Sequence, residues 1–115
     1  MINERQASAY DEIMAELKDG EEIEAVVFAD INDNYCMEDY HLPREYIGRP
    51  LTLREATPYL YGWEISGGYG GEEVIPLYIW TNKRVLLIGC YDGSTWLDGV
   101  PRNPIKCEPY TIGGG

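Results

Sequence analysis

The segment VIPLYIW-TNK-RVLLIGC, residues 74–90, decides the fold of this chain. Its first part alternates, with Ile75, Leu77 and Ile79 on one face, as expected when successive strand side chains point to opposite faces. TNK forms a tight connection, and RVLLIGC contains the apolar run VLLI, which is typical of a strand covered on both faces. The segment therefore predicts a β-hairpin. Pro76 has no N–H to donate, so we expect it at a sheet edge or a bulge.

Further strands are predicted on both sides of this hairpin. Residues 22–28, EIEAVVF, are rich in residues that favour a pleated surface. Residues 61–65 alternate, and residues 95–97 follow an Asp92-Gly93 turn. The connections after residue 60 are short, which favours antiparallel neighbours. We expect an antiparallel, meander-like sheet of three to five strands.

An N-terminal helix is predicted over residues 3–18, with Asn3 as N-cap and Gln6 completing a capping box. Gly20 is the expected stop signal. One apolar stripe at helical spacing is formed by Ala7, Tyr10, Ile13, Met14 and Leu17. This stripe must pack on something, most simply one face of the sheet.

A second, short helix is predicted over residues 53–59. Thr52 and Glu55 have the spacing of a capping box, in which the hydroxyl and the carboxylate cap each other's backbone N–H groups. Pro58 keeps this helix short. The fold class is therefore α+β, a single compact domain over residues 1–115.

The charge of the chain is strongly acidic and unevenly distributed. Of its 115 residues 44% are hydrophobic and 25% charged, as in an ordinary globular domain, and the net charge is −11. Residues 1–40 hold 12 acidic and two basic residues, so they carry −10 of this total. Such a surface repels phosphate groups, which disfavours direct nucleic-acid binding and anionic membranes. It either keeps the protein soluble or docks on a basic protein partner.

Cysteine usage and the N-terminus predict a cytoplasmic protein. Cys36, Cys90 and Cys107 are odd in number, so a complete disulfide framework cannot form. The first residues, MINERQ, contain no basic region followed by an apolar stretch, so we expect no signal or transit peptide.

Motifs for catalysis and metal binding are weak. Residues 30–34, DINDN, open like a calcium loop, but Tyr35 stands where a glycine is needed and His41 where a bidentate glutamate is needed. The glycines of residues 67–71 precede two glutamates, which would repel a phosphate. We expect no catalytic residue, no cofactor and no metal. Whether the single histidine and the cysteines are more than structural stays open.

The aromatic composition is unusual, with ten Tyr and three Trp against one Phe. Most of these residues crowd the second half of the chain. Tyr and Trp combine an apolar body with a polar tip, so they suit a core whose ring tips reach solvent. They also suit a recognition surface, because they dominate interface hot spots, or a pocket for a small ligand.

Three stretches, IWTNKR at residues 79–84, YDGSTW at residues 91–96 and PRNP at residues 101–104, resemble small uncharacterised proteins encoded by bacteriophages and prophages. The resemblance extends over residues 60–104, about two-fifths of the chain, and carries no catalytic or binding residue with it. It implies that a small acidic protein of this kind binds and blocks host machinery, as anti-defence proteins do.

These observations favour a non-enzymatic cytoplasmic protein-binding module, as a phage-encoded inhibitor of a host defence or nucleic-acid-binding protein. Two alternatives stay open, namely a small-ligand-binding protein or enzyme that uses the Tyr/Trp-rich half, and a structural phage component. The oligomeric state is not predicted. The residues expected to contact a partner are acidic side chains with two aromatic anchors: Asp11, Glu12, Glu16, Asp30, Asp33, Glu38, Asp39, Tyr69 and Trp96.

Overall fold

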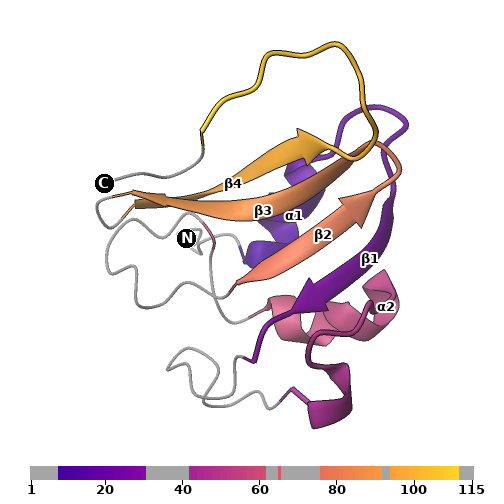
Figure 1. Cartoon of the computed structure of the whole chain (residues 1–115). Helices are drawn as coiled ribbons and strands as arrows, with labels where there is room; N and C mark the ends of the chain where they lie inside the picture. The colour runs from indigo at the N-terminus through magenta and orange to yellow at the C-terminus, as the bar shows by residue number, and fades with distance from the viewer. Residues whose placement is uncertain (1–7, 31–41, 62–64, 66–75, 92–93, 112–115) are drawn as a thin grey trace, which may run out of the picture.

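The computed structural model describes residues 8–30, 42–61, 65, 76–91 and 94–111. A four-stranded antiparallel sheet in the order β1-β2-β3-β4 forms its centre (Figure 1). The strands are β1 (Ile23–Phe28), β2 (Leu77–Thr81), β3 (Arg84–Tyr91) and β4 (Ser94–Pro101). The helices are α1 (Ala9–Glu16) and α2 (Leu53–Ala56), with the 3-10 helices η2 (Arg44–Tyr46) and η3 (Thr57–Leu60). The predicted α+β class is confirmed.

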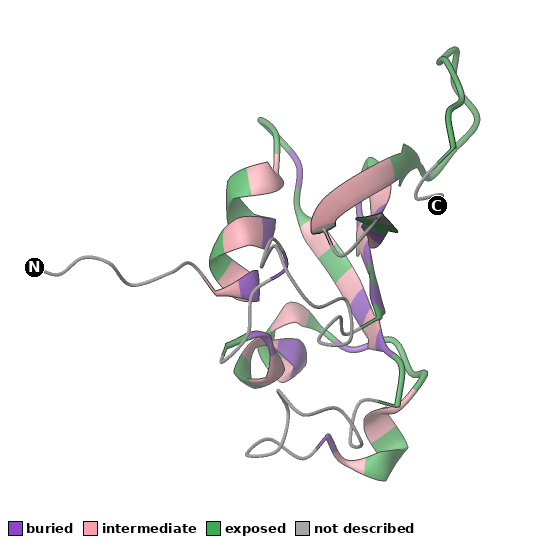
Figure 2. Ribbon diagram, turned by 90° about the vertical axis from the view of Figure 1, so that its left-hand side faces the viewer, coloured by how far each residue is buried: buried purple, intermediate pink, exposed green. Residues whose placement is uncertain are grey.

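Both helices lie on the same side of the sheet, so the described elements make two layers (Figure 2). The core fills the space between the layers, where apolar side chains of α1 and η3 meet those of the central strands. Its largest fully buried side chains are Phe28, Ile13, Leu42, Leu51, Leu60, Ile65, Ile79, Leu86 and Val26. Burial of these side chains supplies the main driving force for the fold.

The start of α1 differs from the prediction. Its N-cap is Ser8, whose hydroxyl accepts a hydrogen bond from the Asp11 N–H at 3.3 Å, while the Asp11 carboxylate accepts one from the Ser8 N–H at 3.2 Å. The predicted capping box of Asn3 and Gln6 lies outside the described residues, and α1 itself begins at Ala9, within the helix predicted over residues 3–18. A hydroxyl and a carboxylate both stabilise the exposed N–H groups of a first helical turn, so the box at Ser8 fixes where α1 begins.

The end of α1 also differs from the prediction. The helix ends at Glu16 because Leu17 adopts an extended conformation, with φ −66° and ψ 141°. The predicted stop at Gly20 is wrong: Gly20 has a φ of 78° and lies in the turn before β1. The backbone carbonyl of Glu16 accepts a hydrogen bond from Arg84 Nη2 at 3.1 Å. A distant side chain therefore caps this helix end, which sequence spacing alone could not indicate.

The capping box predicted for the second helix is confirmed. The Thr52 hydroxyl accepts from the Glu55 N–H at 3.1 Å, and the Glu55 carboxylate accepts from the Thr52 N–H at 3.0 Å. After Ala56 the chain tightens into η3, which contains Pro58 near its start. Because proline cannot donate a backbone hydrogen bond, the single helix predicted over residues 53–59 is instead α2 followed by η3.

The predicted first strand and hairpin are confirmed, with Tyr78 opposite Leu87 and Trp80 opposite Val85. The last strand is longer than the predicted residues 95–97, since β4 pairs with β3 along its full length. A strand was also predicted over residues 61–65, but its two ends are not in a strand and residues 62–64 lie outside the described residues.

The two edges of the sheet differ in whether another described segment of the chain pairs with them. Along β1, the Val26 N–H donates to the Leu51 carbonyl at 2.9 Å and the Leu51 N–H donates back to the Val26 carbonyl at 2.8 Å. Further along, the Gly48 N–H donates to the Phe28 carbonyl at 2.9 Å. The segment before α2 therefore closes the β1 edge, and β4 forms the opposite edge.

Candidate functional site

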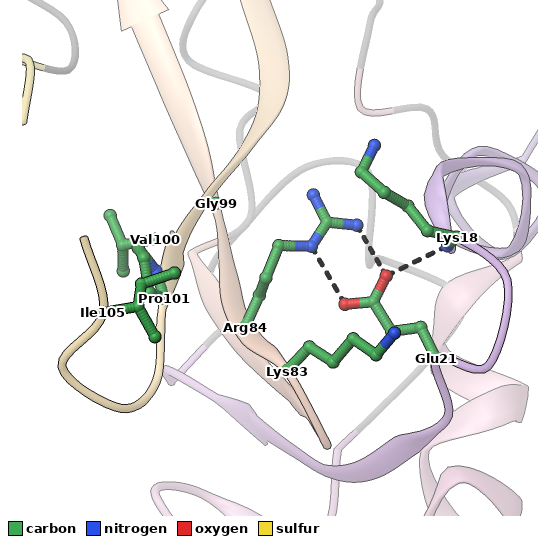
Figure 3. Close-up of a pocket in the computed structure, with 8 residues that line it drawn as sticks. All are labelled: Lys18, Glu21, Lys83, Arg84, Gly99, Val100, Pro101 and Ile105. Carbon is green, nitrogen blue, oxygen red and sulfur yellow. Dashed lines mark hydrogen bonds and ion pairs between the residues drawn. The ribbon is translucent and has the colours of Figure 1, made fainter. Parts of the chain in front are cut away.

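A buried ion pair joins the turn after α1 to the start of β3. The side chain of Glu21 is 0% exposed and that of Arg84 is 19% exposed. Arg84 donates from Nε to Glu21 Oε2 at 2.9 Å and from Nη2 to Glu21 Oε1 at 2.8 Å (Figure 3). This two-pronged geometry matches the planar guanidinium to the carboxylate and makes strong, charge-assisted hydrogen bonds.

Two further donors complete the hydrogen bonding of the Glu21 carboxylate. The Thr81 hydroxyl donates to Oε2 at 2.6 Å, and the Lys18 backbone N–H donates to Oε1 at 3.0 Å. The hydrogen bonds from Arg84 are the main reason why the pKa of Glu21 falls to about 2, even though burial acts in the opposite direction. The carboxylate therefore stays ionised and fully engaged at neutral pH, which makes it a poor general base.

The same guanidinium also holds the end of α1. Arg84 Nη1 lies 3.3 Å from Glu16 Oε2, and Nη2 reaches the Glu16 carbonyl. The hydrogen bond to Glu21 is the largest reason why the pKa of Arg84 is raised above its ordinary value. We call these four residues, Glu16, Glu21, Thr81 and Arg84, the Glu21–Arg84 cluster. It connects α1, β2 and β3 and acts as a cross-link of the fold.

A shallow pocket of about 250 Å³ lies beside this cluster (Figure 3). The charged side chains of Lys18, Lys83 and Arg84 line one side of it, and the other side is formed by Gly99, Val100, Pro101 and Ile105. Lys83 Nζ donates to the Asp19 carbonyl at 3.2 Å. The lining residues thus carry three positive charges, those of Lys18, Lys83 and Arg84, against the one negative charge of Glu21.

The sheet face opposite the helices is mostly apolar and aromatic, with one carboxylate, that of Asp98. In Figure 2 both α1 and α2 lie on the other side of the sheet. The strand registers place on it Ala25, Val27, Tyr78, Trp80, Val85, Leu87, Trp96, Asp98 and Val100, which we call the outer face. Tyr78 is 52% exposed, and its ring packs edge-on against that of Trp80 at a centroid distance of 5.9 Å. A half-exposed tyrosine within an apolar surface is typical of a binding site.

An apolar pocket of about 270 Å³ opens at one end of the outer face. Val27 and Tyr78 belong to both the pocket and the outer face. The remaining lining residues are Phe28, Ala29, Gly48, Pro76 and Leu77. This volume is somewhat below that of most small-molecule sites and is large enough for one apolar side chain of a partner.

The acidic residues predicted on α1 have partners within the fold. Asp11 caps Ser8. Glu12 Oε2 accepts a hydrogen bond from the Ile65 N–H at 2.7 Å, and Glu16 pairs with Arg84. All three lie on the helical side of the sheet, whereas Trp96 lies on the outer face, so the structure does not bring them together with Trp96.

The other predicted contact residues are only partly placed. Asp30 is exposed just beyond the end of β1. Trp96 packs over Gly89, and its indole N–H donates to Asp98 at 3.1 Å. Four of the predicted residues lie outside the described residues: Asp33, Glu38, Asp39 and Tyr69.

Sequence reasoning missed how far the excess acid charge is neutralised. Arg84 pairs with Glu16 and Glu21, and Arg102 pairs with Glu24. These arginines lie more than 60 positions away in the chain, so no local pattern connects them with the N-terminal acids. The outer face could be predicted from the sequence, because Tyr78 and Trp80 alternate with buried residues of the same strand.

Comparison with protein-family models, curated proteins and solved structures gave no match. Within the described ranges, no group of three or more His, Cys, Asp or Glu residues is placed to hold a metal ion. The helices that the structure describes are too short to cross a membrane.

Proposed function

We propose that this chain is a non-enzymatic protein-binding module that contacts its partner through the outer face of the sheet. The observation that carries the proposal is a mostly apolar, aromatic sheet face on the side away from α1 and α2, on which Tyr78 is half-exposed. Exposed apolar patches on small soluble domains commonly mark interaction sites.

The outer face has the composition of an interface core. Tyr78 and Trp80 supply rigid aromatic area, and Val85 and Leu87 supply half-buried aliphatic area beside them. The adjacent apolar pocket offers a recess for an anchoring side chain from the partner. Anchors of this kind, seated in a desolvated recess, contribute most of the binding energy of typical interfaces.

The net charge of −11 supports a basic partner. Arginines neutralise Glu16, Glu21 and Glu24 locally, so the charge does not form one continuous patch from these residues. The field of the whole molecule still attracts a cationic protein and speeds its encounter with the outer face. The resemblance to phage proteins favours a host defence or nucleic-acid-binding protein in the cytoplasm as this partner.

Two matched arginine variants test the proposal. Tyr78→Arg places a charge on the outer face, and Tyr61→Arg makes the same change at a 40% exposed tyrosine that stacks on Tyr10 of α1. Both variants and the wild-type chain are tagged and used to capture proteins from host lysate at low and high salt. Thermal unfolding of each variant controls for loss of structure.

We expect wild type and Tyr61→Arg to capture the same basic protein, with less capture at high salt because charge attraction is screened. Tyr78→Arg should reduce its capture by about 30-fold, as expected when about 2 kcal/mol of hot-spot energy is lost. Equal capture by all three chains would contradict a role for the outer face. Failure of wild type to retain any protein would contradict the binding function itself.

The small-ligand alternative has one observation in its favour, the pocket at Val27 and Tyr78. A thermal-shift screen of nucleotides, metabolites and metals separates the two functions. A ligand present at 100 times its Kd stabilises the fold by about 2.7 kcal/mol, so a site of this kind gives a clear shift.

A further inference from the structure

The backbone of β4 presents hydrogen-bonding groups on the side away from β3. The Gly99 N–H donates to the Asp98 carboxylate at 2.8 Å and the Gly99 carbonyl accepts from the Tyr110 hydroxyl at 2.9 Å, so Gly99 does not use its backbone groups on β3. In an antiparallel pair, the backbone groups of successive residues point alternately towards the partner strand and away from it. The backbone groups of Thr95 and Leu97, like those of Gly99, therefore point away from β3. In the described part of the chain, no backbone group outside the sheet pairs with them.

A C-terminal arm, residues 102–111, contacts one end of the exposed β4 edge. The arm arches away from the sheet after β4 (Figure 1), and every one of its residues is exposed. It returns at Tyr110, whose hydroxyl binds both the Asp98 carboxylate and the Gly99 carbonyl. The hydroxyl thus occupies the place where the N–H of an added strand would bind Gly99. Tyr110 is 62% exposed, so little burial of the ring adds to these hydrogen bonds.

We propose that β4 accepts an extended, positively charged segment of the partner protein as a fifth strand, and that the C-terminal arm competes with this segment at Gly99. The inference rests on the proposed protein-binding function and names how the partner adds to the sheet. Strand addition uses backbone hydrogen bonds for affinity and leaves side chains to provide specificity.

Electrostatics favours a positively charged partner segment over a second copy of this chain at the β4 edge. A second copy of this chain would also carry a net charge of −11, so electrostatic repulsion opposes pairing between the β4 strands of two copies. Asp98 accepts hydrogen bonds from Trp96, Gly99 and Tyr110. When Tyr110 withdraws, the Asp98 carboxylate loses one donor and can accept a lysine or arginine from the added strand. The new strand would also extend the outer face next to Val100.

Synthetic peptides test this inference on the full chain. The probe is KVKVKVK, and its matched controls are KVKPKVK, which has the same charge but cannot form a continuous strand, and EVEVEVE, which has the opposite charge. Amide hydrogen exchange at Thr95 and Leu97 reports pairing at the β4 edge. The Tyr110→Phe variant removes only the hydroxyl of an exposed ring, so it should fold normally.

We expect KVKVKVK to slow exchange at Thr95 and Leu97, and Tyr110→Phe to bind it about two- to tenfold more tightly, the effect of one competing hydrogen bond. Equal protection by KVKPKVK, or by EVEVEVE, would overturn the inference. So would dimerisation of Tyr110→Phe in light-scattering measurements, because the edge would then pair with a second copy. Tyr78→Arg should still bind the peptide, so failure at this edge is distinguishable from failure of the outer face.

Discussion

Replacing Glu21 by glutamine should cost most of the stability that the Glu21–Arg84 cluster provides. The change keeps the shape of the side chain and removes its charge, leaving the Arg84 guanidinium with Glu16 as its ionic partner. The pKa of Glu21 is about 2 against an ordinary 4.5, a difference of about 300-fold in proton affinity. That factor corresponds to about 3 kcal/mol of folding free energy, similar to the cost of breaking other buried ion pairs.

The effect has a defined pH dependence. The folded pKa of Glu21 lies below its unfolded value, so its contribution is fully present above pH 4.5 and is lost as the pH falls towards 2. At pH 3 the unfolded chain has already bound the proton, and the remaining contribution is about 1 kcal/mol. The difference in unfolding free energy between wild type and Glu21→Gln should therefore shrink from about 3 kcal/mol at pH 7 to about 1 kcal/mol at pH 3.

Urea unfolding followed by tryptophan fluorescence measures this difference at both pH values. Glu24→Gln is the matched control, because Glu24 also pairs with an arginine but its side chain is 50% exposed. An exposed pair of this kind contributes no more than about 1 kcal/mol. A loss below about 1 kcal/mol for Glu21→Gln at pH 7, or an equal loss at pH 7 and pH 3, would refute the reasoning.

Three further substitutions probe the sheet, the turn at Gly48 and the second helix. In Gly89→Ala the added Cβ would lie 2.6 Å from the Trp96 ring, so we expect a loss of about 1–3 kcal/mol and a shift of tryptophan fluorescence. Gly48→Ala, with open space but a φ of +72°, should lose about 1 kcal/mol without that shift, and identical spectra for both variants would contradict the packing argument. Thr52→Ala should cost about 1 kcal/mol in urea unfolding through loss of the capping box with Glu55, and an unchanged midpoint would contradict that role.

Local sequence patterns predicted those parts of the fold that local interactions determine. The capping box of Thr52 and Glu55 needs only residues three positions apart, and it forms as expected. The β2–β3 hairpin likewise follows from alternation on both sides of a short turn, with Tyr78 opposite Leu87. In both cases the residues that decide the structure are neighbours in the chain.

The ends of α1 and β4 could not be predicted in this way. The sequence predicts a helix from residue 3, but α1 begins after Ser8 instead, and Ala9 and Ile13 pack in the core directly behind this cap. β4 continues through Gly99, a residue that usually weakens strands, because β3 offers a partner for each of its residues. Tertiary context thus overrode local preference at both places.

For the candidate site, the sequence predicted which residue types are abundant but not which of them pair or lie on the same face. The sequence shows many N-terminal acids and a Tyr/Trp-rich second half, and the structure makes use of both. Pairing of Glu21 with Arg84 spans 63 positions, and no spacing rule points to it. The gathering of Tyr78, Val85 and Val100 on one face depends on the register of three strands, which follows from the strand pairing.

The pairing of β1 with β2 affects how this chain folds during its synthesis on the ribosome. β1 has emerged long before residues 77–81 exist, and the guanidinium that caps α1 belongs to residue 84. Until then Val26 and Phe28 lack their neighbouring strand, and a newly made N-terminal half exposes apolar surface that chaperones recognise. Folding should accordingly begin late in translation, at the hairpin, and then recruit the helix and first strand across a large loop.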